Sequence, residues 1–223
     1  MRIDVVADIV CPWCYIGIRR LRAALNKRPD VRPAVHWRPY LLNPDVGPEG
    51  MRQAEFLARA FGSESRVRRF QETVQRAGKS VGIEFRFESA DFTPFALPAH
   101  RLLSLLDGES RVLELADTLF TGYFTHGQNL GDIEVLAEAG KSYGIKRSDV
   151  VAAVTGADSA ASITIDDSET HRLGINGVPS FIFAEQHVIS GAHDDEVLTH
   201  MIDVAAAGFP RGENLTSLPA SSI

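Results

Sequence analysis

The chain has 223 residues, of which 44% are hydrophobic and 23% are charged. This is the composition of an ordinary globular protein with a sizeable core, and it excludes collagen-like repeats and disulfide-rich scaffolds. The 23 Lys and Arg residues against 29 Asp and Glu residues give a net charge of -6, which argues against nucleic acid as the main partner.

The N-terminal segment predicts neither export nor membrane insertion. Asp4 and Asp8 interrupt its apolar residues, so it lacks the uninterrupted run of about 7–15 apolar residues that a signal peptide needs. No other window approaches the roughly 20 apolar residues that cross a bilayer. We therefore expect a cytoplasmic protein with no membrane partner, in a compartment where thiols are kept reduced.

The first forty residues predict a strand, a helix and a second strand, the order of a βαβ unit. Apolar and β-branched residues over 3–7 indicate a buried strand. Pro12 suits the first position of a helix, whose apolar residues recur at helical spacing until Pro29. A second strand is expected over 34–38.

A long helical block and a second mixed segment follow. From 51 to 157 the apolar residues recur at helical spacing, and glycines punctuate the stretch as helix stops. Its one extended piece, 83–87, alternates with period two. Beyond the block we expect a helix that ends near Gly174, then a hairpin and a last helix. The hairpin strands are expected at 178–183 and 187–190, and the helix over 194–207.

These changes of period divide the chain into modules. The segments 1–48 and 158–208 are expected to form one discontinuous α/β domain, with the helical domain 49–157 inserted between them. The tail, 209–223, carries prolines, glycines and serines and is expected to be flexible.

The only cysteines of the chain, Cys11 and Cys14, lie at the expected start of the first helix in the motif Cys-Pro-Trp-Cys. There a sulfur lies beside unpaired backbone N–H groups and the positive end of the helix dipole, which stabilise a thiolate. We therefore predict that Cys11 is exposed, ionised and nucleophilic, and that Cys14, one turn into the helix, is shielded. Cys11 would form a mixed disulfide with a partner, and Cys14 would resolve it.

Three other interpretations of the cysteine pair stay open. A zinc site needs about four ligands, and the one histidine pair at a suitable spacing, His187 and His193, lies far along the chain; we expect no metal. A structural disulfide would close a very short loop and stabilise little. Two inert core thiols are the third alternative, against which the Pro12 and Trp13 spacer at a helix start argues.

A proline near the second mixed segment bears on the same chemistry. Pro179 follows Gly177 and Val178 and precedes an expected strand, where it cannot donate to a central ladder. Only about 5–6% of X–Pro bonds are cis, so the residues alone favour a trans turn. A cis bond would expose the backbone N–H and C=O of Val178 to an extended peptide or to the cysteinyl part of glutathione.

Five segments spread over nearly the whole chain are specific as a set: 8–17, 37–44, 99–102, 174–181 and 190–192. In them the chain resembles the DsbA-like branch of the thioredoxin superfamily. Within that branch it resembles the cytoplasmic FrnE-type subgroup, which is grouped with 2-hydroxychromene-2-carboxylate isomerases and kappa-class glutathione transferases. The resemblance implies a thioredoxin fold interrupted by an all-helical insertion domain, and a protein-disulfide oxidoreductase or isomerase.

The resemblance also implies site residues and partners. It makes Cys11 the nucleophile, Cys14 the resolving cysteine and Pro179 a cis-proline facing them. Expected partners are protein thiols and disulfides, or glutathione as redox partner or cosubstrate, with no resident cofactor; a homodimer is compatible with the sequence. The isomerases and kappa-class transferases carry serine where Cys11 stands, so this chain departs from them.

Two other functions stay open beside disulfide exchange. One is a glutathione-dependent isomerase or transferase acting on a small aromatic or polyketide-like substrate, since the insertion would roof a cleft over Cys11. The other is a non-catalytic binding module with a structural metal. The dithiol favours thiol–disulfide exchange over both.

Supporting roles are predicted close to the cysteines. Asp8, three residues before Cys11, would shuttle the proton of Cys14, or it would hydrogen-bond the turn as an ordinary loop acid. Pro12 would start the helix, and Trp13 would shape the surface beside Cys11.

More distant residues are candidates for binding substrate. His100 and Arg101 would overhang the site from the helical block, or they would form a solvated helix face. Ser190 precedes the last helix, whose N-terminus would hold a carboxylate such as that of glutathione, although Asp194 in this region opposes that by charge. Trp37 is expected in the core.

Overall fold

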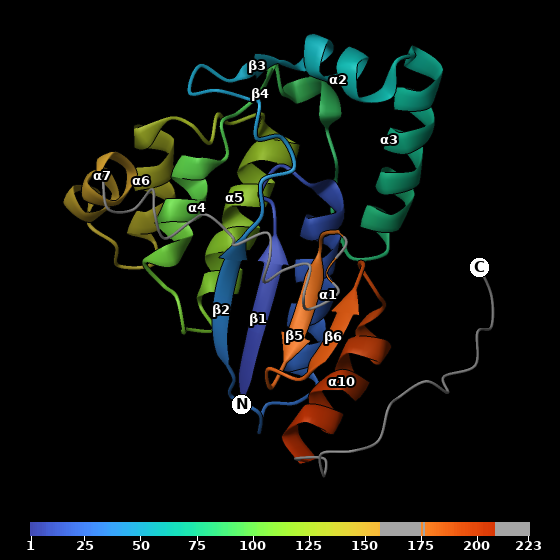
Figure 1. Ribbon diagram of the computed structural model, residues 1–223, viewed down its shortest axis with the longest axis vertical. Coiled ribbons are helices and arrows are strands. Elements are labelled where there is room, and N and C mark those ends of the chain that lie inside the picture. The colour runs from blue at the N-terminus through green and yellow to red at the C-terminus, as the bar shows by residue number, and fades with distance from the viewer. Residues whose placement is uncertain (157–174, 176, 208–223) are drawn as a thin grey trace.

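The computed structural model describes residues 1–156, 175 and 177–207 (Figure 1). The helix expected to end near Gly174 and the tail expected over 209–223 lie outside these residues. None of the helices in the described part has the length and apolar character needed to cross a bilayer.

A four-stranded mixed sheet forms the centre of the discontinuous module (Figure 1). Its strand order is β2-β1-β5-β6; β1 is parallel to β2 and antiparallel to β5, which pairs in turn with antiparallel β6. Because β1 runs toward Cys11 and Val6 lies opposite Ser180, the residues that precede β5 lie at the same end of the sheet as the cysteine turn. The strands are β1 (Arg2–Ala7), β2 (Ala34–Pro39), β5 (Ser180–Phe183) and β6 (His187–Ser190).

Helix α1 (Pro12–Asn26) begins and ends where the sequence predicts. Pro12 occupies its first turn, where a missing N–H costs no hydrogen bond, and the helix stops three residues before Pro29. Its apolar side buries Ile16 and Leu21 completely. Figure 1 shows α1 behind the sheet beside α10 (Asp195–Ala207), and the two helices are in contact.

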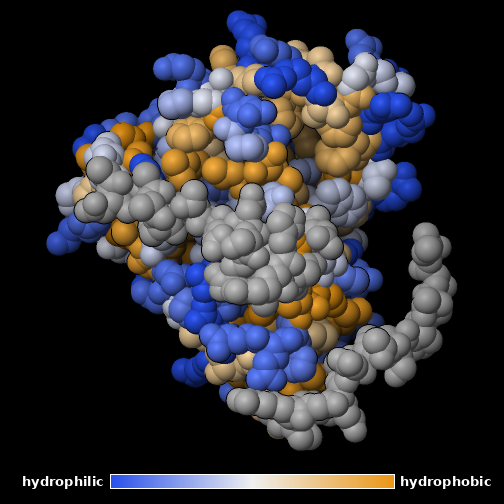
Figure 2. Space-filling model, viewed as in Figure 1, coloured by the Kyte–Doolittle hydropathy of each residue, from blue (hydrophilic) through white to orange (hydrophobic). Residues whose placement is uncertain are grey.

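The insertion is a helical block, as predicted, and it also contains a short two-stranded antiparallel ribbon that the sequence did not indicate. The ribbon pairs Met51 with Thr93 and Arg52 with Phe92. Hydrophilic side chains gather over the outer side of α3 in Figure 2. The elements of the block are β3 (Met51–Arg52), α2 (Gln53–Phe61), α3 (Glu64–Lys79), the 3-10 turn η1 (Phe87–Ser89), β4 (Phe92–Thr93), α4 (Leu97–Ser104), α5 (Val112–His126), α6 (Ile133–Lys141) and α7 (Arg147–Thr155).

The extended piece predicted at 83–87 belongs to neither sheet, and its last residue, Phe87, begins η1. Ile83 and Phe85 are buried, whereas Glu84 and Arg86 are exposed. A single backbone hydrogen bond, from Arg86 N to the Phe124 oxygen at 2.9 Å, ties this stretch to α5. The alternation therefore arises because an extended segment lies against a helix, with no partner strand.

The loop after α4 covers the outer edge of β2. The carboxylate of Asp107 accepts a hydrogen bond from Trp37 N at 3.0 Å and lies 2.9 Å from His36 Nδ1. Gly108 N donates to the Val35 oxygen at 2.9 Å. The insertion is thus joined by backbone and side-chain hydrogen bonds to the edge of the sheet.

One hydrophobic core joins the sheet, α1 and the insertion. Tyr15 of α1 has its ring centroid 5.1 Å from that of Phe120 and 5.8 Å from that of Phe85. Its hydroxyl lies 2.7 Å from Thr121 Oγ1, so the polar end of the ring has a partner. The division into two domains stays a prediction, since both predicted modules contribute to this core.

Candidate active site

The cysteine turn links β1 to α1. Cys11 N donates to the Asp8 oxygen at 3.1 Å, and Tyr15 N donates to the Cys11 oxygen at 3.2 Å. Cys11 caps α1 with extended backbone and no side-chain capping bond, so its sulfur does not satisfy the first N–H groups as a capping hydroxyl would. The start of the helix and the position of Pro12 are as predicted.

The two thiols are both free, and they differ in burial. Cys14 has no exposed surface, as predicted, and Cys11 keeps 5% of its own. The expectation that Cys11 is exposed was wrong. Cys11 is buried because it packs in the hydrophobic cluster formed by residues of α1 and of the insertion. Only a small part of the residue therefore reaches the surface.

Cys14 is held as a neutral thiol. Burial raises its pKa well above the ordinary value, and its hydrogen bond to Cys11 and the charge of that sulfur act in the same direction. A backbone hydrogen bond from Asp8 opposes the shift, whereas the charge of the Asp8 carboxylate adds to it. Cys14 therefore needs a proton acceptor before it can act as a nucleophile.

Pro179 packs against α1 one turn after the cysteine pair. The bond between Val178 and Pro179 is cis, as the resemblance implies and against the base rate for the residues alone. A Cβ on Gly17 would lie 2.9 Å from Pro179 Cγ and 3.1 Å from Phe181 Cζ. The helix approaches β5 this closely because residue 17 has no side chain.

The hairpin braces Pro179 from its other side. Gly191 N donates to the Pro179 oxygen at 2.7 Å, and Ser180 Oγ donates to Ser190 Oγ at 2.8 Å. Ser190 is exposed at the end of β6. The acids at the start of α10 are paired with bases of α1, Asp194 with Arg20 and Asp195 with Lys27. The carboxylate-binding role of Ser190 stays a prediction.

Asp8 lies completely buried beside the cysteine turn. Its Oδ1 accepts from Val10 N at 3.2 Å, and its Oδ2 accepts from Leu42 N at 2.7 Å. The alternative in which Asp8 bonds its own turn is therefore confirmed. The proton shuttle is a separate role and stays a prediction; the charge of the Asp8 carboxylate does raise the pKa of Cys14.

His100 is buried rather than exposed on a helix face. It has no exposed surface, so the expectation that it overhangs the site and binds substrate was wrong. Trp37 Nε1 donates to His100 Nδ1 at 3.0 Å, and His100 Nε2 lies 3.4 Å from Asp8 Oδ1. Its neighbour Arg101 instead binds the carbonyl oxygen of Val154. Trp37 is in the core, as expected.

A second polar group near Asp8 was not predicted. Burial raises the pKa of Tyr123 to about 12; a hydrogen bond with Thr93 lowers it, and the charge of Asp8 raises it further. The Tyr123 hydroxyl also donates to Gln53 Oε1 at 3.4 Å, and Thr93 Oγ1 donates to the same oxygen at 2.6 Å. In the sequence Tyr123 is one member of an apolar helix face. Its hydroxyl is the one sign that it could belong to a polar group near the site.

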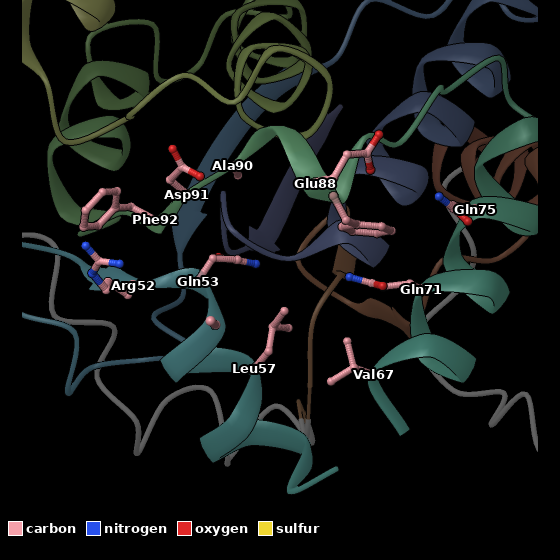
Figure 3. A pocket seen from close by; sticks show the side chains of 12 residues that line it. Arg52, Gln53, Leu57, Val67, Gln71, Gln75, Glu88, Ala90, Asp91 and Phe92 are labelled. Carbon is pink, nitrogen blue, oxygen red and sulfur yellow. The ribbon is translucent and has the colours of Figure 1, made fainter. Parts of the chain in front are cut away.

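The insertion also contains a cleft of about 660 Å³ between α2, α3 and the segment that leads to β4. Figure 3 shows Leu57 of α2 and Val67 of α3 on facing walls, with Glu88 above them. Neither cysteine lines this cleft; its link to the site is Gln53, which also accepts from Tyr123. In the described residues no group of three or more His, Cys, Asp or Glu side chains is placed to hold a metal ion.

Residues 2–203 match the family model of the DSBA-like thioredoxin domain. The chain belongs to the DsbA-like thioredoxin domain family. The resemblance noted in the sequence is thereby confirmed at family level, together with the thioredoxin fold and its helical insertion. DsbA-like proteins are oxidoreductases or related isomerases, and the narrower FrnE-type assignment stays a prediction.

Solved structures of DsbA-like proteins share this fold. The probable DsbA oxidoreductase from Streptomyces coelicolor superposes with a TM-score of 0.80 at 26% identity, over 96% of this chain and 94% of that chain. The cytosolic disulfide reductase DsbM from Pseudomonas aeruginosa, with GSH, gives 0.60 at 18% identity over 93% and 96%. A 2-hydroxychromene-2-carboxylate isomerase gives 0.62 at 14% over 93% and 95%.

Proposed function

We propose that this protein is a cytoplasmic thiol–disulfide oxidoreductase of the FrnE type that exchanges disulfides through Cys11 and Cys14. The observation that carries the proposal is the asymmetric pair itself. Two free thiols lie at the start of α1; Cys11 retains some exposed surface and Cys14 none. An outside disulfide can therefore reach Cys11 alone.

The reaction proceeds in two balanced steps. The Cys11 thiolate attacks one sulfur of a partner disulfide; a Cys11–partner S–S bond forms, the partner S–S bond breaks, and one partner thiolate leaves. The Cys14 thiolate then attacks the Cys11 sulfur, forms the intramolecular disulfide and releases the second partner thiolate. Two electrons pass from the protein to the partner, and the same steps in reverse oxidise a dithiol partner.

The second step requires that Cys14 lose a proton. Burial raises the pKa of Cys14, so the proton must be accepted by a nearby group. Asp8 is the acceptor we propose, because it is buried and both its backbone and its carboxylate interact with Cys14. The proton then passes to the departing partner thiolate or to water.

The partner is a protein disulfide or glutathione. Val178 makes no backbone hydrogen bond to another described residue, so its N–H and C=O are available to the main chain of a peptide or of glutathione. The DsbM structure from Pseudomonas aeruginosa contains GSH, which supports glutathione as a partner here. His100 takes no part in contacting the partner because it is buried.

A redox titration tests the proposal. Equilibration with reduced and oxidised glutathione, over potentials from roughly -120 to -320 mV, should give one reversible disulfide, followed by mass spectrometry after acid quench. Cys14→Ser should accumulate a glutathione adduct on Cys11, and Cys11→Ser should accumulate none. If the wild-type protein forms no intramolecular disulfide across this range, the proposal fails. Glutathione-dependent turnover of a small aromatic substrate that survives in Cys11→Ser would point instead to an isomerase.

A further inference from the structure

A line of buried polar side chains leads from β2 to the cysteine turn. Trp37 on β2 donates from Nε1 to His100 Nδ1 at 3.0 Å. His100 on α4 places Nε2 at 3.4 Å from Asp8 Oδ1, and the backbone of Asp8 bonds Cys14. Asp8, Cys14 and His100 have no exposed surface, and Trp37 has 4%. Bulk solvent therefore does not reach these contacts.

The partners of His100 assign its protonation. An indole N–H can only donate, so the Nδ1 atom that faces Trp37 must accept with its lone pair. The ring proton of a neutral imidazole then lies on Nε2, toward Asp8. A cationic His100 would carry a proton on both nitrogens, and two buried N–H groups would oppose one another at Trp37. Trp37 therefore favours the neutral Nε2–H form.

This form matters for the carboxylate of Asp8. The groups that face Asp8 are the backbone N–H groups of Val10 and Leu42, the imidazole of His100, and the titratable groups whose ionisation senses its charge, Cys14 and Tyr123. A neutral donor orients the carboxylate without adding a positive charge. An imidazolium in the same place would stabilise the carboxylate and weaken it as a proton acceptor.

We propose that His100, oriented by Trp37, is a positioning residue that keeps the carboxylate of Asp8 ready to accept the proton of Cys14. His100 exchanges no proton itself; it holds a neutral Nε2–H on Asp8 Oδ1. The inference rests on the proposed function for its consequence in disulfide exchange. The tautomer of His100 can be tested without it.

The first experiment reads the tautomer directly. In the reduced wild-type protein, the ¹⁵N shifts of the His100 ring should show a protonated Nε2 and an unprotonated Nδ1, the tautomer that the hydrogen bond from Trp37 requires. His100→Gln assigns the signals among the seven histidines. Trp37→Phe should remove the preference for this tautomer, because the indole donor to Nδ1 is lost. A wild-type His100 that carries a proton on Nδ1 overturns the proposal.

The second experiment reads the Cys14 step. Protein mixed rapidly with oxidised glutathione is quenched with acid at intervals, and mass spectrometry follows the decay of the Cys11–glutathione adduct to the intramolecular disulfide. His100→Leu should slow this decay by about tenfold, part of the effect of a full proton acceptor, and should change its pH profile. His100→Gln, whose amide offers an acceptor and a donor in similar places, should restore most of the rate. Asp8→Asn should be slower than either.

Leu103→Val is the matched control, because Leu103 is equally buried on the same helix but carries no polar group. A decay in His100→Leu as fast as in this control, with the wild-type pH profile, would contradict the proposal; so would His100→Gln as slow as His100→Leu. Failure of the proposed function would look different, since then no variant, nor the wild type, would form the adduct, and the NMR measurement would still decide the tautomer.

Discussion

The reactive pair is built from two identical side chains in unequal surroundings. Cys11 caps the helix and reaches the surface with 5% of its area, whereas Cys14 is enclosed. Burial and the neighbouring Cys11 sulfur raise the pKa of Cys14. The two cysteines therefore react in a fixed order. Cys14 stays an unreactive thiol until a mixed disulfide on Cys11 brings an electrophilic sulfur to it.

The raised pKa of Cys14 predicts how the stability of the reduced protein depends on pH. Its contribution to folding is fully present below the unfolded thiol pKa of about 8.5 and is lost as the pH rises through the higher folded value. We expect the free energy of unfolding to decline from about pH 8.5 upward more steeply in the wild type than in Cys14→Ala. Urea unfolding under reducing conditions, over a series of alkaline pH values, measures this; parallel declines would contradict it.

At the residue scale, the sequence identifies the reactive side chains more successfully than it predicts which residues bury and contact them. The cysteines and Asp8 were singled out because they lie at an expected helix start, whereas the cis bond before Pro179 was implied by the family resemblance alone. His100 was misjudged because its partner Trp37 lies 63 residues away, and no local pattern shows which helix positions press against a distant strand. The burial of Cys11 was missed for the same reason.

At the scale of elements, the contact of α1 with β5 positions the site. Gly17 lets the helix lie against Pro179 and Phe181, which places the proline one turn beyond Cys14. A side chain at this position would have to displace the ring of Pro179. That ring is closed onto its own backbone, so it cannot rotate away as a flexible side chain could. The separation of α1 from the Pro179 loop is thus set by the absence of one carbon.

Gly17→Ala is therefore expected to destabilise the protein by about 1–2 kcal/mol, because crowding of about 2–3 kcal/mol, expected for a contact this close, outweighs a gain of about 1 kcal/mol in helix propensity. Gly47→Ala is the control, since a Cβ there meets nothing within 4 Å. Thermal or urea unfolding of both variants measures the difference. Equal stability of Gly17→Ala and the wild type would show that the helix and loop can separate freely.

The elements also show where periodicity fails as a guide. The helices of the insertion were predicted from repeating apolar residues, but the ribbon of β3 and β4 has only two residues in each strand, too few for any alternation to register. The stretch at 83–87 shows that side chains can alternate without a partner strand, since the alternation there arises from contact with a helix. A period reports which side chains are buried; it does not report what buries them.

At the scale of the whole molecule, the shared core couples the sheet to the insertion. Phe120 of α5 is completely buried and stacks on Tyr15 of α1, so the cysteine helix and the insertion cover one another. Separate folding of the two predicted modules would leave these rings in water. The chain is therefore expected to unfold in one transition.

Phe120→Ala tests this coupling. Truncation of a buried phenylalanine costs about 3–5 kcal/mol, and the loss should lower a single transition seen alike by circular dichroism and by tryptophan fluorescence. Phe92→Ala is the control: Phe92 is 46% exposed, so its truncation should change stability by about 0.5 kcal/mol or less. Two separated transitions, with only one of them moved by Phe120→Ala, would show that the modules are independent.

The hydrogen bonds that Asp107 and Gly108 make to β2 have a further consequence for association. An open sheet edge offers a row of backbone donors and acceptors on which another chain can add a strand. The insertion occupies that row at Trp37 and Val35. Another strand therefore cannot pair with this part of β2 while the insertion is in place. Misassembly through β2 should therefore be greatest in partly folded molecules whose insertion has not yet docked.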